Sequence, residues 1–482
     1  MATHLLWLRN DLRVDDHPAL LAALRGAGAL VPVYVLDDRL FAPTRWGFPK
    51  TGAFRARFLL ESLRDLRASL RARGSDLVVR RGAPADVLPA LARETGAAAV
   101  FAHAEPMTEE QADEAAVREA LGGVPLRTGW AHTLLHPDDL PFALDRLPGV
   151  FTAFRKAVER AWRVRPAREA PEALPPLPGG LAPGDLPADV GVFGLEPQTP
   201  DPRAVPFAGG ETAARARLQR YVWQDDRLRV YKETRNGLVG DDFASRLSPY
   251  LAHGALSPRR VYAEVKRYER ERVANESTYW LVFELLWRDY FRFYGAQQGA
   301  RLFWAAGPRA RGGAQPFHAP LFEAWTAGQT GYPFVDAAMR ELAGSGFMSN
   351  RARQNAASFW ARTLGQDWRA GAAWFESLLV DYDVTSNWGN WAYVAGTGND
   401  PRDRTFNVVR QAQMYDADGA FMRRWVPELA AVPDRHLPAP WTLPADVARR
   451  AGVRLGVNYP NPVVRPDGQT RPEPKAERSR RS

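Results

Sequence analysis

The stretch DYDVTSNWGNW, residues 381–391, is the most informative part of this chain. Asp381 and Asp383 lie two residues apart and Asn387 lies four residues beyond Asp383, so one turn can direct several hydrogen-bonding groups at a single polar ligand. Trp391 closes the stretch and adds an oxidisable ring beside that ligand. Few hydrolytic sites need so much indole, and the stretch therefore predicts a site for a redox cofactor.

Segments on both sides of this stretch, in the expected order, resemble the photolyase/cryptochrome family. They are LLWLRNDLRVDDHPAL (5–20), LPGVFTAFRKAVE (147–159), VYKETRNGLVGDDFASRLSPYLAHGALSPR (230–259), STYWLVFELLWRDYFRF (277–293), GYPFVDAAMRELAGSGFMSNRARQNAASFW (331–360), DWRAGAAWFESLLVDYDVTSNWGNW (367–391) and AGTGNDPR (395–402). The resemblance covers residues 3–460, and VYKETRNG, FMSNRARQN, DYDVTSNWGNW and NYPNP are most similar to the DASH cryptochromes. It implies an FAD protein of photolyase fold, in a group associated with repair of cyclobutane pyrimidine dimers, best in single-stranded DNA.

The first 135 residues alternate short apolar runs with amphipathic stretches. The runs LLWLR, LVPVYVL, DLVVRR, AAVFAHA and PLRTGW predict buried strands. The amphipathic stretches between them end at glycine, as helices commonly do. This alternation predicts an α/β domain with a doubly wound parallel sheet (Rossmann-like) over residues 1–135. No G-x-G-x-x-G follows the first strand, which argues against ordinary dinucleotide binding there.

The rest of the chain divides into a connector, a helical domain and an extension. Residues 136–210 are the expected connector, and after residue 165 they are too rich in proline and glycine to support long helices. Residues 211–440 are expected to form an all-α FAD-binding domain, with the clearest helices at 211–235, 257–273 and 278–297. Residues 441–482 form a C-terminal extension whose basic end, without apolar anchors, is expected to be disordered.

Composition narrows the class of protein further. The net charge of +9 favours a polyanionic partner, because neutralising phosphates releases counterions; an arginine-rich composition with a basic tail explains the charge equally well. The chain contains no cysteine, which excludes disulfides, iron–sulfur clusters and thiol nucleophiles. It shows no secretory signal and no apolar run of about 20 residues. A soluble, cytoplasmic monomer is therefore expected.

The resemblance assigns the phosphates of FAD to the turn before Pro249. Hydroxyls and backbone N–H groups at a turn suit an anion. Taken alone, the turn is more typical of a serine cap before a helix. The neighbouring motifs of the family occur at the expected positions around it and favour the phosphate-binding loop instead. Ala244 stands where the family has a hydroxyl residue, which removes one phosphate contact. The residues implied here are Tyr231, Ser245, Arg246, Leu247 and Ser248.

Asp381, Asp383 and Asn387 resemble the residues at the flavin edge. Arg353 is expected to pair with Asp381 across the ring, because a buried carboxylate needs such a partner. Asn387 matches the position that faces the flavin N5, where a neutral carboxamide supports reduced flavin. Plant photoreceptor cryptochromes have an acid there, so Asn387 favours repair; only its register distinguishes it from an ordinary turn residue.

Two tryptophans match the family's chain of electron donors. Trp391 corresponds to the proximal member and Trp368 to the middle one, although buried aromatic residues at helical spacing are often simply core. The distal tryptophan falls at Gln315, which cannot be oxidised. Other exits are then Trp374, Trp304 or Tyr393.

The substrate wall is the next set that the resemblance implies. Trp287 and Tyr393 match the aromatic residues that hold a flipped dimer, and Glu284 matches the acid that hydrogen-bonds its base edge. A tyrosine stacks less than the tryptophan of many double-strand photolyases, which agrees with single-stranded substrate. The residues given to catalysis are Glu284, Trp287, Asn387 and Tyr393.

Three further residues are implied at the same mouth. They are Asn350, which also counts among the cofactor-binding residues, Arg351 and Gln354. Enzymes that act on (6-4) products carry histidine where this chain has Asn350 and Gln354. Because amides lack the proton donor required there, cyclobutane dimers are favoured as the substrate.

Arginines near these motifs are candidates for gripping the DNA backbone. Arginine runs are more often solvated surface, so the group carries more weight than any member. The candidates are Arg235, Arg288, Arg351, Arg402 and Arg404, with Glu284, Trp287, Asn350 and Gln354 as the remaining DNA contacts.

An antenna chromophore is expected in the N-terminal domain. Glu105, in FAHAEPMTEE, matches the acid that binds the pterin of a folate antenna in related proteins. An acid at this place can also be only the N-terminal charge of a helix. We therefore expect methenyltetrahydrofolate, with flavin mononucleotide and a deazaflavin as alternatives.

Other chemistries lack their motifs. The histidines show no metal-ligand spacing, and without cysteine no metal site is expected. No G-x-S-x-G and no G-x-x-x-x-G-K-[ST] are present, so hydrolases and nucleoside triphosphatases lack support. The resemblance thus implies a deoxyribodipyrimidine photolyase in which light drives an electron from reduced FAD to the dimer. The alternatives are a blue-light receptor that binds nucleic acid without repair, and a silent flavin-binding structural protein.

Overall fold

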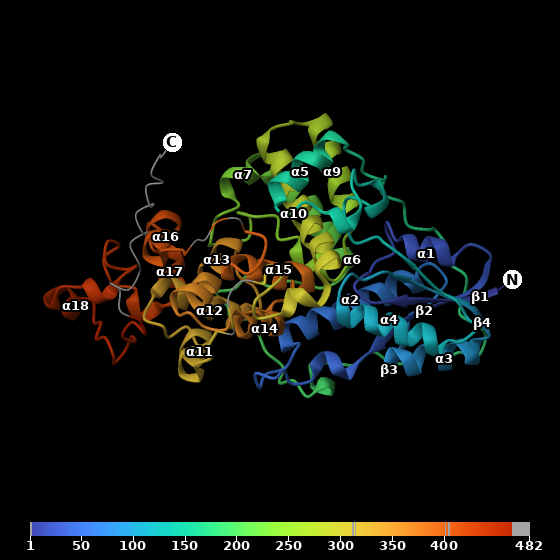
Figure 1. Ribbon diagram of the computed structural model, residues 1–482, viewed down its shortest axis with the longest axis horizontal. Helices are drawn as coiled ribbons and strands as arrows, with labels where there is room; N and C mark the ends of the chain where they lie inside the picture. Colours follow the sequence, from blue (N-terminus) through green and yellow to red (C-terminus); the bar gives the residue numbers. More distant parts are fainter. Residues whose placement is uncertain (1, 311–312, 314, 401, 403–404, 465–482) are drawn as a thin grey trace, which may run out of the picture.

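The computed structural model describes residues 2–310, 313, 315–400, 402 and 405–464. A parallel sheet with its flanking helices lies at one end of the molecule, on the right in Figure 1, and helices build the remainder. The expected fold class, an α/β domain followed by a helical domain, is confirmed. The expected disorder at residues 465–482 lies outside the described residues.

The sheet has five strands in the order β3-β2-β1-β4-β5, and all neighbours are parallel. The strands are β1 (Ala2–Leu8), β2 (Ala27–Leu36), β3 (Val78–Arg81), β4 (Ala97–His103) and β5 (Leu126–Gly129). All five lie within or across the apolar runs that predicted them. Parallel strands buried on both faces read as continuous apolar runs, which is why these were recognisable.

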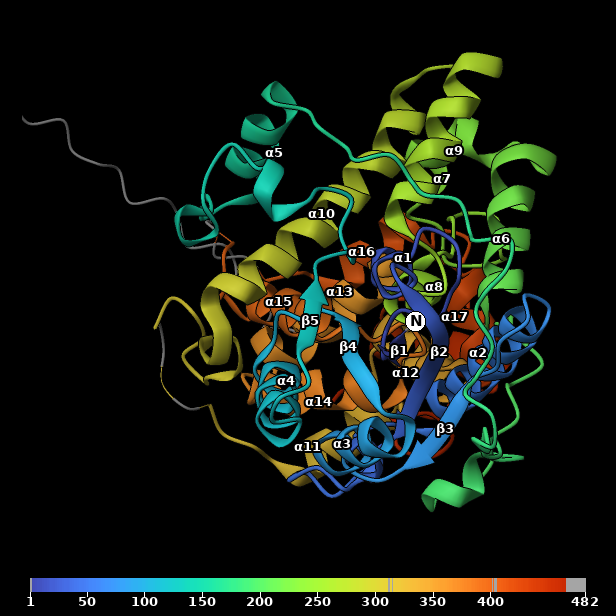
Figure 2. The ribbon, with the colours of Figure 1, turned by 90° about the vertical axis from the view of Figure 1, so that its right-hand side faces the viewer.

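Helices cover both faces of the sheet, and alternate residues of β1 point to each. Leu6 and Leu8 pack with α1 (Pro18–Ala23) and α2 (Ala53–Arg71), whereas Leu5 and Trp7 pack with the other two helices. Those are α3 (Pro84–Thr95) and α4 (Thr108–Ala120). Figure 2 looks along the molecule at this layered arrangement. The period of two along β1 produces the two faces.

The loop after β1 ties the sheet to the helical half. Arg13 is buried and donates to the carbonyl of Gly254 at 2.8 Å. Asp16 forms a buried pair with Arg259, with Nη2 and Oδ1 2.8 Å apart. Gly254, at φ +65°, lies so close to Asn10 that a Cβ would meet its carbonyl oxygen at 1.8 Å. The resemblance motif RNDLRVDDHP thus has a structural role between the two halves.

The connecting region contains one longer helix, α5 (Phe151–Arg160), and then runs without long helices to residue 210. The helical half follows and is built around the long α10, which crosses the middle of the molecule in Figure 1. Its first helices are α6 (Glu211–Gln219), α7 (Tyr231–Thr234), α8 (Ser248–Ala252), α9 (Pro258–Glu271) and α10 (Glu276–Gln298). The others are α11 (Ala319–Thr326), α12 (Pro333–Ser345), α13 (Asn350–Ser358), α14 (Trp368–Leu378), α15 (Val384–Ala395), α16 (Val408–Tyr415), α17 (Ala420–Trp425) and α18 (Ala445–Arg450).

The prediction of one helix over residues 211–235 is wrong. After α6 the chain makes a π-helical turn, Arg220–Gln224, and α7 begins only at Tyr231. Asp226 between them has φ +52°, which breaks the helix, and its carboxylate accepts from the hydroxyl of Tyr268 at 2.5 Å. A contact to α9 therefore overrides the local helical pattern.

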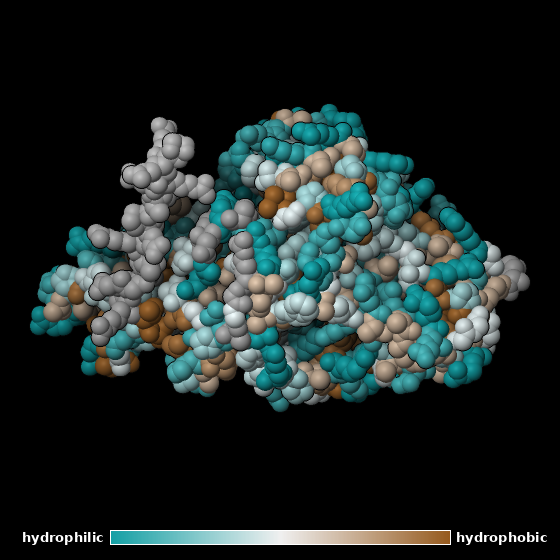
Figure 3. Space-filling view, viewed as in Figure 1, coloured by the Kyte–Doolittle hydropathy of each residue, from teal (hydrophilic) through white to brown (hydrophobic). Residues whose placement is uncertain are grey.

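Two large apolar clusters hold the helical half together. One surrounds α10 with α5 and α9, and the other packs α12 to α17. In the view of Figure 3, hydrophilic residues cover most of the surface and the apolar ones form small separate groups. Among the described residues, no helix is both long and apolar enough to span a membrane.

Candidate functional site: a polar cavity among the helices

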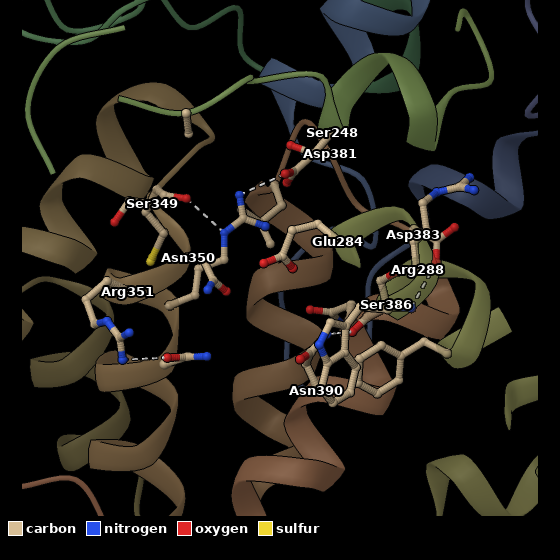
Figure 4. Close-up of a pocket in the computed structure, with 18 of the residues that line it drawn as sticks. Ser248, Glu284, Arg288, Ser349, Asn350, Arg351, Asp381, Asp383, Ser386 and Asn390 are labelled. Carbon is tan, nitrogen blue, oxygen red and sulfur yellow. Dashed lines mark hydrogen bonds and ion pairs between the residues drawn. The ribbon is translucent and has the colours of Figure 1, made fainter. Parts of the chain in front are cut away.

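A cavity of about 530 Å³ opens among α7, α8, α10, α13 and α15. That volume is typical of sites for cofactors and small molecules. All residues expected at the cofactor and substrate sites line it, from segments separated by as many as 171 positions between Tyr231 and Arg402. Trp368 and Glu105 are not among the lining residues. In Figure 4, Asp381 and Ser248 lie on one side, Asp383 and Arg288 on another, and Glu284 reaches into the space between.

The turn before α8 presents its backbone to the cavity. Arg246 has φ +54°, a conformation that strains a residue with a Cβ, and Leu247 after it is helical. This succession turns neighbouring N–H groups to one side, as in anion-binding nests. The Arg246 guanidinium stacks between Phe207 and Phe347, at 4.3 and 4.8 Å from the ring centroids. Burial lowers its pKa to about 10. The strained conformation thus directs backbone N–H groups to the cavity, while the packed side chain of Arg246 holds the turn in place.

Asp381 lines the cavity, and only one of its two carboxylate oxygens is hydrogen-bonded among the described residues. Its Oδ2 accepts from Arg353 Nη2 at 2.8 Å, and Arg353 is itself fixed by Nε donation to the Met348 carbonyl at 2.9 Å. Within the described part of the chain, the buried Oδ1 of Asp381 has no hydrogen-bond partner. An acceptor buried without a donor costs free energy unless a ligand supplies one. The expected Arg353–Asp381 pair is therefore present and is incomplete by itself.

Asp383 is fully engaged by the protein. It caps α15, where Oδ1 accepts from the Ser386 amide at 2.9 Å and from the Thr385 hydroxyl at 2.6 Å. Its Oδ2 accepts from Arg292 at 2.5 Å. Burial acts to raise the pKa of Asp383, but Arg292 and these hydrogen bonds outweigh burial and hold the pKa well below its usual range. This carboxylate is a fixed negative charge at the cavity wall.

Asn387 lies one turn further along α15. Its amide nitrogen Nδ2 donates to the carbonyl of Ala372 at 3.0 Å, and its backbone N–H donates to Asp383. Only 8% of the residue is exposed, and what is exposed lines the cavity. Because Nδ2 is held by α14, the carboxamide orientation is set by the fold rather than by a ligand.

The aromatic residues behind the cavity form more contacts than the sequence indicated. Trp391 lines the cavity, and its ring centroid lies 6.1 Å from that of Trp325 and 5.0 Å from that of Phe375. Trp325 in turn lies 5.3 Å from Trp360. Trp368 donates Nε1 to the Ala305 carbonyl at 3.0 Å. Sequence reasoning missed Trp325, because nothing local marks it as a neighbour of Trp391.

The residues considered as alternative electron exits lie apart from one another. Gln315 is exposed, and the ring of Trp304 is 53% exposed. Trp374 is half-buried and packs edge-on against Phe48 at 5.0 Å. Tyr393 is at the cavity, edge-on to Trp287 at 6.2 Å. Trp325 is thus an aromatic neighbour of Trp391 that the sequence did not indicate.

The substrate-side residues come from α10 and α15. Glu284 accepts from Arg235 Nη1 at 2.6 Å, and burial raises the pKa of this carboxyl despite the arginine. Trp287 stacks on Phe151 with centroids 3.7 Å apart and planes at 11°. Phe151 lies in the connecting region, outside the cavity lining, and sequence reasoning gave it no role. One face of Trp287 is therefore covered from behind.

The start of α13 supplies the other side of the mouth. Ser349 caps this helix by accepting from the Ala352 amide at 3.2 Å. Arg351 donates to Gln354 at 3.0 Å and to Asn236 at 3.1 Å. Its guanidinium lies 4.2 Å from the ring centroid of Tyr415. Asn350 lines the cavity beside it.

The candidate phosphate-binding arginines differ in how exposed they are and in how many hydrogen bonds they already form with the protein. Arg288 donates to the carbonyls of His132 and Leu251, the latter at 2.9 Å, so it lies inside the wall rather than on the rim. Burial lowers its pKa to about 10. Arg402 keeps 60% of its side chain exposed beside Asp400. Arg404 lies outside the described residues.

Glu105 is buried in a polar bridge between the two halves. Its Oε2 lies 3.2 Å from Arg292 Nη1, and its Oε1 lies 3.2 Å from His132 Nε2. Burial opposes ionisation, but His132 and Arg292 outweigh it and hold the pKa of Glu105 well below its usual range. Arg292 also binds Asp383, so a charge at the end of β4 is connected to the cavity wall. Sequence reasoning missed Arg292.

Two other acids near Glu105 are incompletely paired. Glu110 Oε2 and Glu376 Oε1 are buried, and neither finds a hydrogen-bond partner among the residues that the structure describes. Burial raises the pKa of Glu110 to about 7 and also raises the pKa of Glu376. Lys50 Nζ lies 4.0 Å from Glu376, and Trp388 donates to the other oxygen of that acid at 3.0 Å.

A cluster of Asp11, His17 and His103 has ligand atoms within 4.8 Å of one another, in spite of the absence of metal-ligand spacing in the sequence. His17 caps α1 by accepting the Leu20 amide at Nδ1, 3.1 Å away, so the ring proton must lie on Nε2. That nitrogen faces Asp11 at 3.1 Å. A metal-bound histidine instead donates its other ring N–H, so the protonation of His17 disfavours a metal ion here.

Comparison with known protein families finds two matches along the chain. Residues 4–176 match the family model described as DNA photolyase, and residues 280–475 match the FAD binding domain of DNA photolyase. The cavity is lined largely from the second of these segments. The resemblance recognised from the sequence is confirmed.

Individual proteins similar to this chain agree with the two family matches. A cryptochrome DASH of Gloeobacter violaceus is 53% identical over 466 residues, which is 96% of this chain and 93% of that protein. The crystal structure of a Synechocystis cryptochrome superposes with a TM-score of 0.93 at 49% identity, over 96% of each chain. A class III photolyase from Agrobacterium tumefaciens superposes with a TM-score of 0.82 at 31% identity, over 96% of this chain and 95% of that one.

Proposed function

The chain belongs to the photolyase/cryptochrome family, and on that premise we propose that it repairs cyclobutane pyrimidine dimers in DNA, with light as the energy source and with preference for single strands. The observation that carries the proposal is the composition of one cavity wall. Asp381 offers a flavin one carboxylate oxygen without a hydrogen-bond partner in the described residues, and Glu284, Trp287 and Tyr393 offer an acid and aromatic faces for two linked pyrimidines taken out of the stack.

The described residues fit FAD. The Arg246 turn suits its pyrophosphate, and the spare oxygen of Asp381 suits an N–H of the ring. Asp383 holds a fixed negative charge, and Asn387 holds a neutral amide whose orientation the fold sets. When bound, fully reduced FAD supplies the light-driven transfer of one electron that splits the cyclobutane ring, and the electron returns without net redox change.

The protein contributes binding, orientation and exclusion of water to this chemistry. Trp287, backed by Phe151, offers a rigid surface on which a pyrimidine stacks. Glu284 reaches the base edge, and Tyr393 stands edge-on to Trp287 across the mouth. Asn350 and Gln354 are amides, which favours cyclobutane dimers over (6-4) products. No side chain acts as a nucleophile.

Single-stranded DNA suits this site because its bases need not be unpaired, which saves a few kcal/mol. Arg235, Arg351 and Arg402 are placed to bind the backbone, and we expect affinity to fall as salt concentration rises. Arg288 contributes to the cavity wall rather than to the rim.

A folate antenna is part of the proposal. Glu105 is its sequence-based ligand, but both oxygens of Glu105 already have protein partners. Glu110 and Glu376 each keep one oxygen without a hydrogen bond among the described residues, and these oxygens are our candidates to accept from the N–H groups of a pterin ring. An absorption spectrum of the purified protein distinguishes folate from a flavin mononucleotide or a deazaflavin.

The test uses purified, reduced protein and an oligonucleotide with one thymine dimer. Under blue light we expect intact thymine to be restored over many turnovers, faster on the single strand than on the duplex. A Glu284→Gln variant should lose most of the rate, whereas Glu276→Gln, at the exposed start of the same helix, should not. Flavin binding and a photocycle without restored thymine would overturn the proposal.

The alternative function is a blue-light receptor that binds nucleic acid without repair. Gln315 at the distal donor position favours it, since the expected electron route is interrupted there. In that case the dimer oligonucleotide remains unrepaired in the assay above, while light still changes the flavin spectrum.

A further inference from the structure

Among the described residues, Glu284 forms an ion pair with Arg235, and both side chains line the cavity. Arg235 ends α7, and its Nη1 lies 2.6 Å from Glu284 Oε1. The side chains keep 22% and 31% of their surface exposed, respectively. Both line the cavity, into which Glu284 points in Figure 4. A base that reaches Glu284 must therefore compete with the guanidinium of Arg235.

The guanidinium of Arg235 is not fully used by the protein. Its buried Nε finds no hydrogen-bond partner among the described residues. Besides Glu284, its guanidinium lies 5.2 Å from the ring centroid of Trp280. By contrast, Arg353 uses both Nε and Nη2 in hydrogen bonds. A phosphate at the rim would offer Arg235 a fork of acceptors that Glu284 does not.

The edge of a pyrimidine explains what Glu284 requires. The thymine edge carries an N–H donor beside a carbonyl acceptor. A carboxylate can accept from the N–H, but its second oxygen then faces the carbonyl oxygen and repels it. A carboxylic acid accepts at one oxygen and donates at the other, so it matches both groups at once.

We propose that Arg235 exchanges partners when a flipped dimer enters the cavity, leaving Glu284 for a DNA phosphate, and that Glu284 takes up one proton from solvent and donates it as a hydrogen bond to the base carbonyl. The exchange rests on the proposed function and specifies how that site recognises its substrate. The net reaction is binding of the dimer with uptake of one proton per site. No bond other than the O–H of Glu284 is formed.

The direction of protonation follows from the contacts. Burial raises the pKa of Glu284; Arg235 is the charged group that opposes this effect, and the indole of Trp280 opposes it to a smaller extent. Removing the arginine and excluding water with a base both act to raise the pKa further. Tyr231, on the same helix as Arg235, has its pKa raised well above 10 by burial and remains neutral.

The other cations at the cavity are engaged elsewhere. Arg288, one turn later on α10, donates to two backbone carbonyls. Arg351, from α13, donates to Gln354 and Asn236. Arg402 lies beside Asp400. Helices α13 and α15 also contribute the neutral amides Asn350 and Asn390 to the cavity lining. No second cation replaces Arg235 in this arrangement.

The experiment measures proton uptake by calorimetry. Protein with bound FAD is titrated in the dark with a single-stranded oligonucleotide that contains one thymine dimer, in buffers of different ionisation enthalpy at pH 7.5. The dependence of the heat on the buffer gives the number of protons bound. We expect about one proton per site for the unchanged protein, and affinity that falls by up to about tenfold per pH unit between the pKa of Glu284 in the free protein and its higher pKa in the complex.

Three variants make the result specific. Glu284→Gln should bind the dimer without proton uptake. Arg235→Gln should show less uptake, because Glu284 is already protonated before binding, and its salt slope should be smaller by about 0.7. Glu276→Gln removes the exposed Lys232–Glu276 pair between the same two helices and should keep the uptake of the unchanged protein. Flavin absorbance confirms folding in each case.

Two results would overturn the exchange. Tight binding of the dimer with no uptake would show that Glu284 stays ionised. Undiminished uptake in Glu284→Gln would place the proton on another group. If the dimer oligonucleotide binds no better than undamaged DNA, the proposed function itself fails, which is a different outcome from binding without a proton.

Discussion

The cavity around Asp381 and the cluster around Asp11 use the same kinds of side chain in two different ways. In the cluster, Asp11, His17 and His103 are buried against one another, with ligand atoms within 4.8 Å and a proton of His17 between them. In the cavity, Asp381 pairs with Arg353 through one oxygen only, and the other is buried without a hydrogen-bond partner among the described residues. The cluster lies in the α/β half, after β1 and at the end of β4, where its three side chains are buried. The cavity is complete only with a ligand.

The largest effect should come from breaking one acid in each region. Asp381→Ala leaves Arg353 unpaired beside the ring, and truncating one member of a buried charge pair costs about 2–5 kcal/mol. We therefore expect the flavin dissociation constant to rise on the order of 100-fold or more, measured by ultrafiltration and absorbance. The fold should survive, because the cavity is already open to water.

The matched change in the cluster is Asp11→Asn. It removes the charge that faces two histidines, so we expect a loss of unfolding free energy of about 1.5–3 kcal/mol, since polar contacts of these rings with a charged acceptor are lost. Flavin affinity at low temperature should stay within a few-fold of the unchanged protein. If Asp11→Asn released flavin as strongly as Asp381→Ala, the distinction between the two regions would be false.

The next largest effect should come from lowering the pH, which should reduce the free energy of unfolding through the buried histidines. Burial lowers the pKa of His103 and of His132 in the folded protein, so the unfolded chain binds more protons below about pH 6.5. The free energy of unfolding should therefore fall as pH decreases from 6.5, by up to about 1.4 kcal/mol per unit for each histidine. Urea unfolding at pH 7.5, 6.5 and 5.5 measures this.

His103→Gln should flatten that dependence, and the exposed His318→Gln should leave it unchanged. A flat profile in the unchanged protein would mean that the cluster opens to water or that its histidines are protonated in the folded state. The carboxylates Asp11 and Glu105, whose pKa values are held low, add further acid sensitivity below about pH 4.

Much of the fold could be predicted because its signals are local. The five strands are continuous apolar runs, and the helices between them end at or a few residues before a glycine, so period and turn chemistry placed them. The break at Asp226 could not be predicted, because the positive φ is held by Tyr268, 42 positions away. Helical patterning over residues 211–235 was real but was overridden by a tertiary contact.

The residues of the site likewise divide into those that a local motif could predict and those that only the fold brings together. Asp381, Asp383 and Asn387 are close in sequence, so a motif could place them together at the cavity. Arg292 and Phe151 carry no motif, and their roles arise from contacts with Glu105 and Trp287 across the fold. No sequence pattern could indicate that Glu105 is saturated by His132 and Arg292 while Glu110 is not.

A smaller effect tests the aromatic side of the cavity. Trp391→Phe should slow photoreduction of bound flavin at least about tenfold, because phenylalanine is far harder to oxidise than indole, with 1.4 kcal/mol corresponding to each factor of ten. If the contact at 6.1 Å carries electrons, Trp325→Phe should slow it several-fold as well. The measurement is the rise of reduced flavin under blue light with a thiol donor.

Trp304→Phe is the matched control, since its ring is 53% exposed at the surface. Equal slowing by Trp325→Phe and Trp304→Phe would argue against a specific route through Trp325. Slowing by Trp368→Phe alone would restore the route implied by the resemblance and leave Trp325 as core.

The smallest effect should come from behind the cavity, at Phe151. Phe151→Leu keeps an apolar side chain of similar volume but removes the ring that stacks on Trp287, and such ring pairs contribute about 0.5–1.5 kcal/mol. If Trp287 is held flat for a base by that stack, affinity for the dimer in the dark should fall about two- to tenfold with flavin affinity unchanged. Near-ultraviolet circular dichroism should lose the signal of the stacked pair. Phe142→Leu, which removes a ring 6.1 Å from Phe154 and not stacked on Trp287, is the matched control. A loss of flavin in Phe151→Leu would show that Phe151 supports the cofactor side of the cavity, as the charged residues do, and that the aromatic wall is not a separate part of the site.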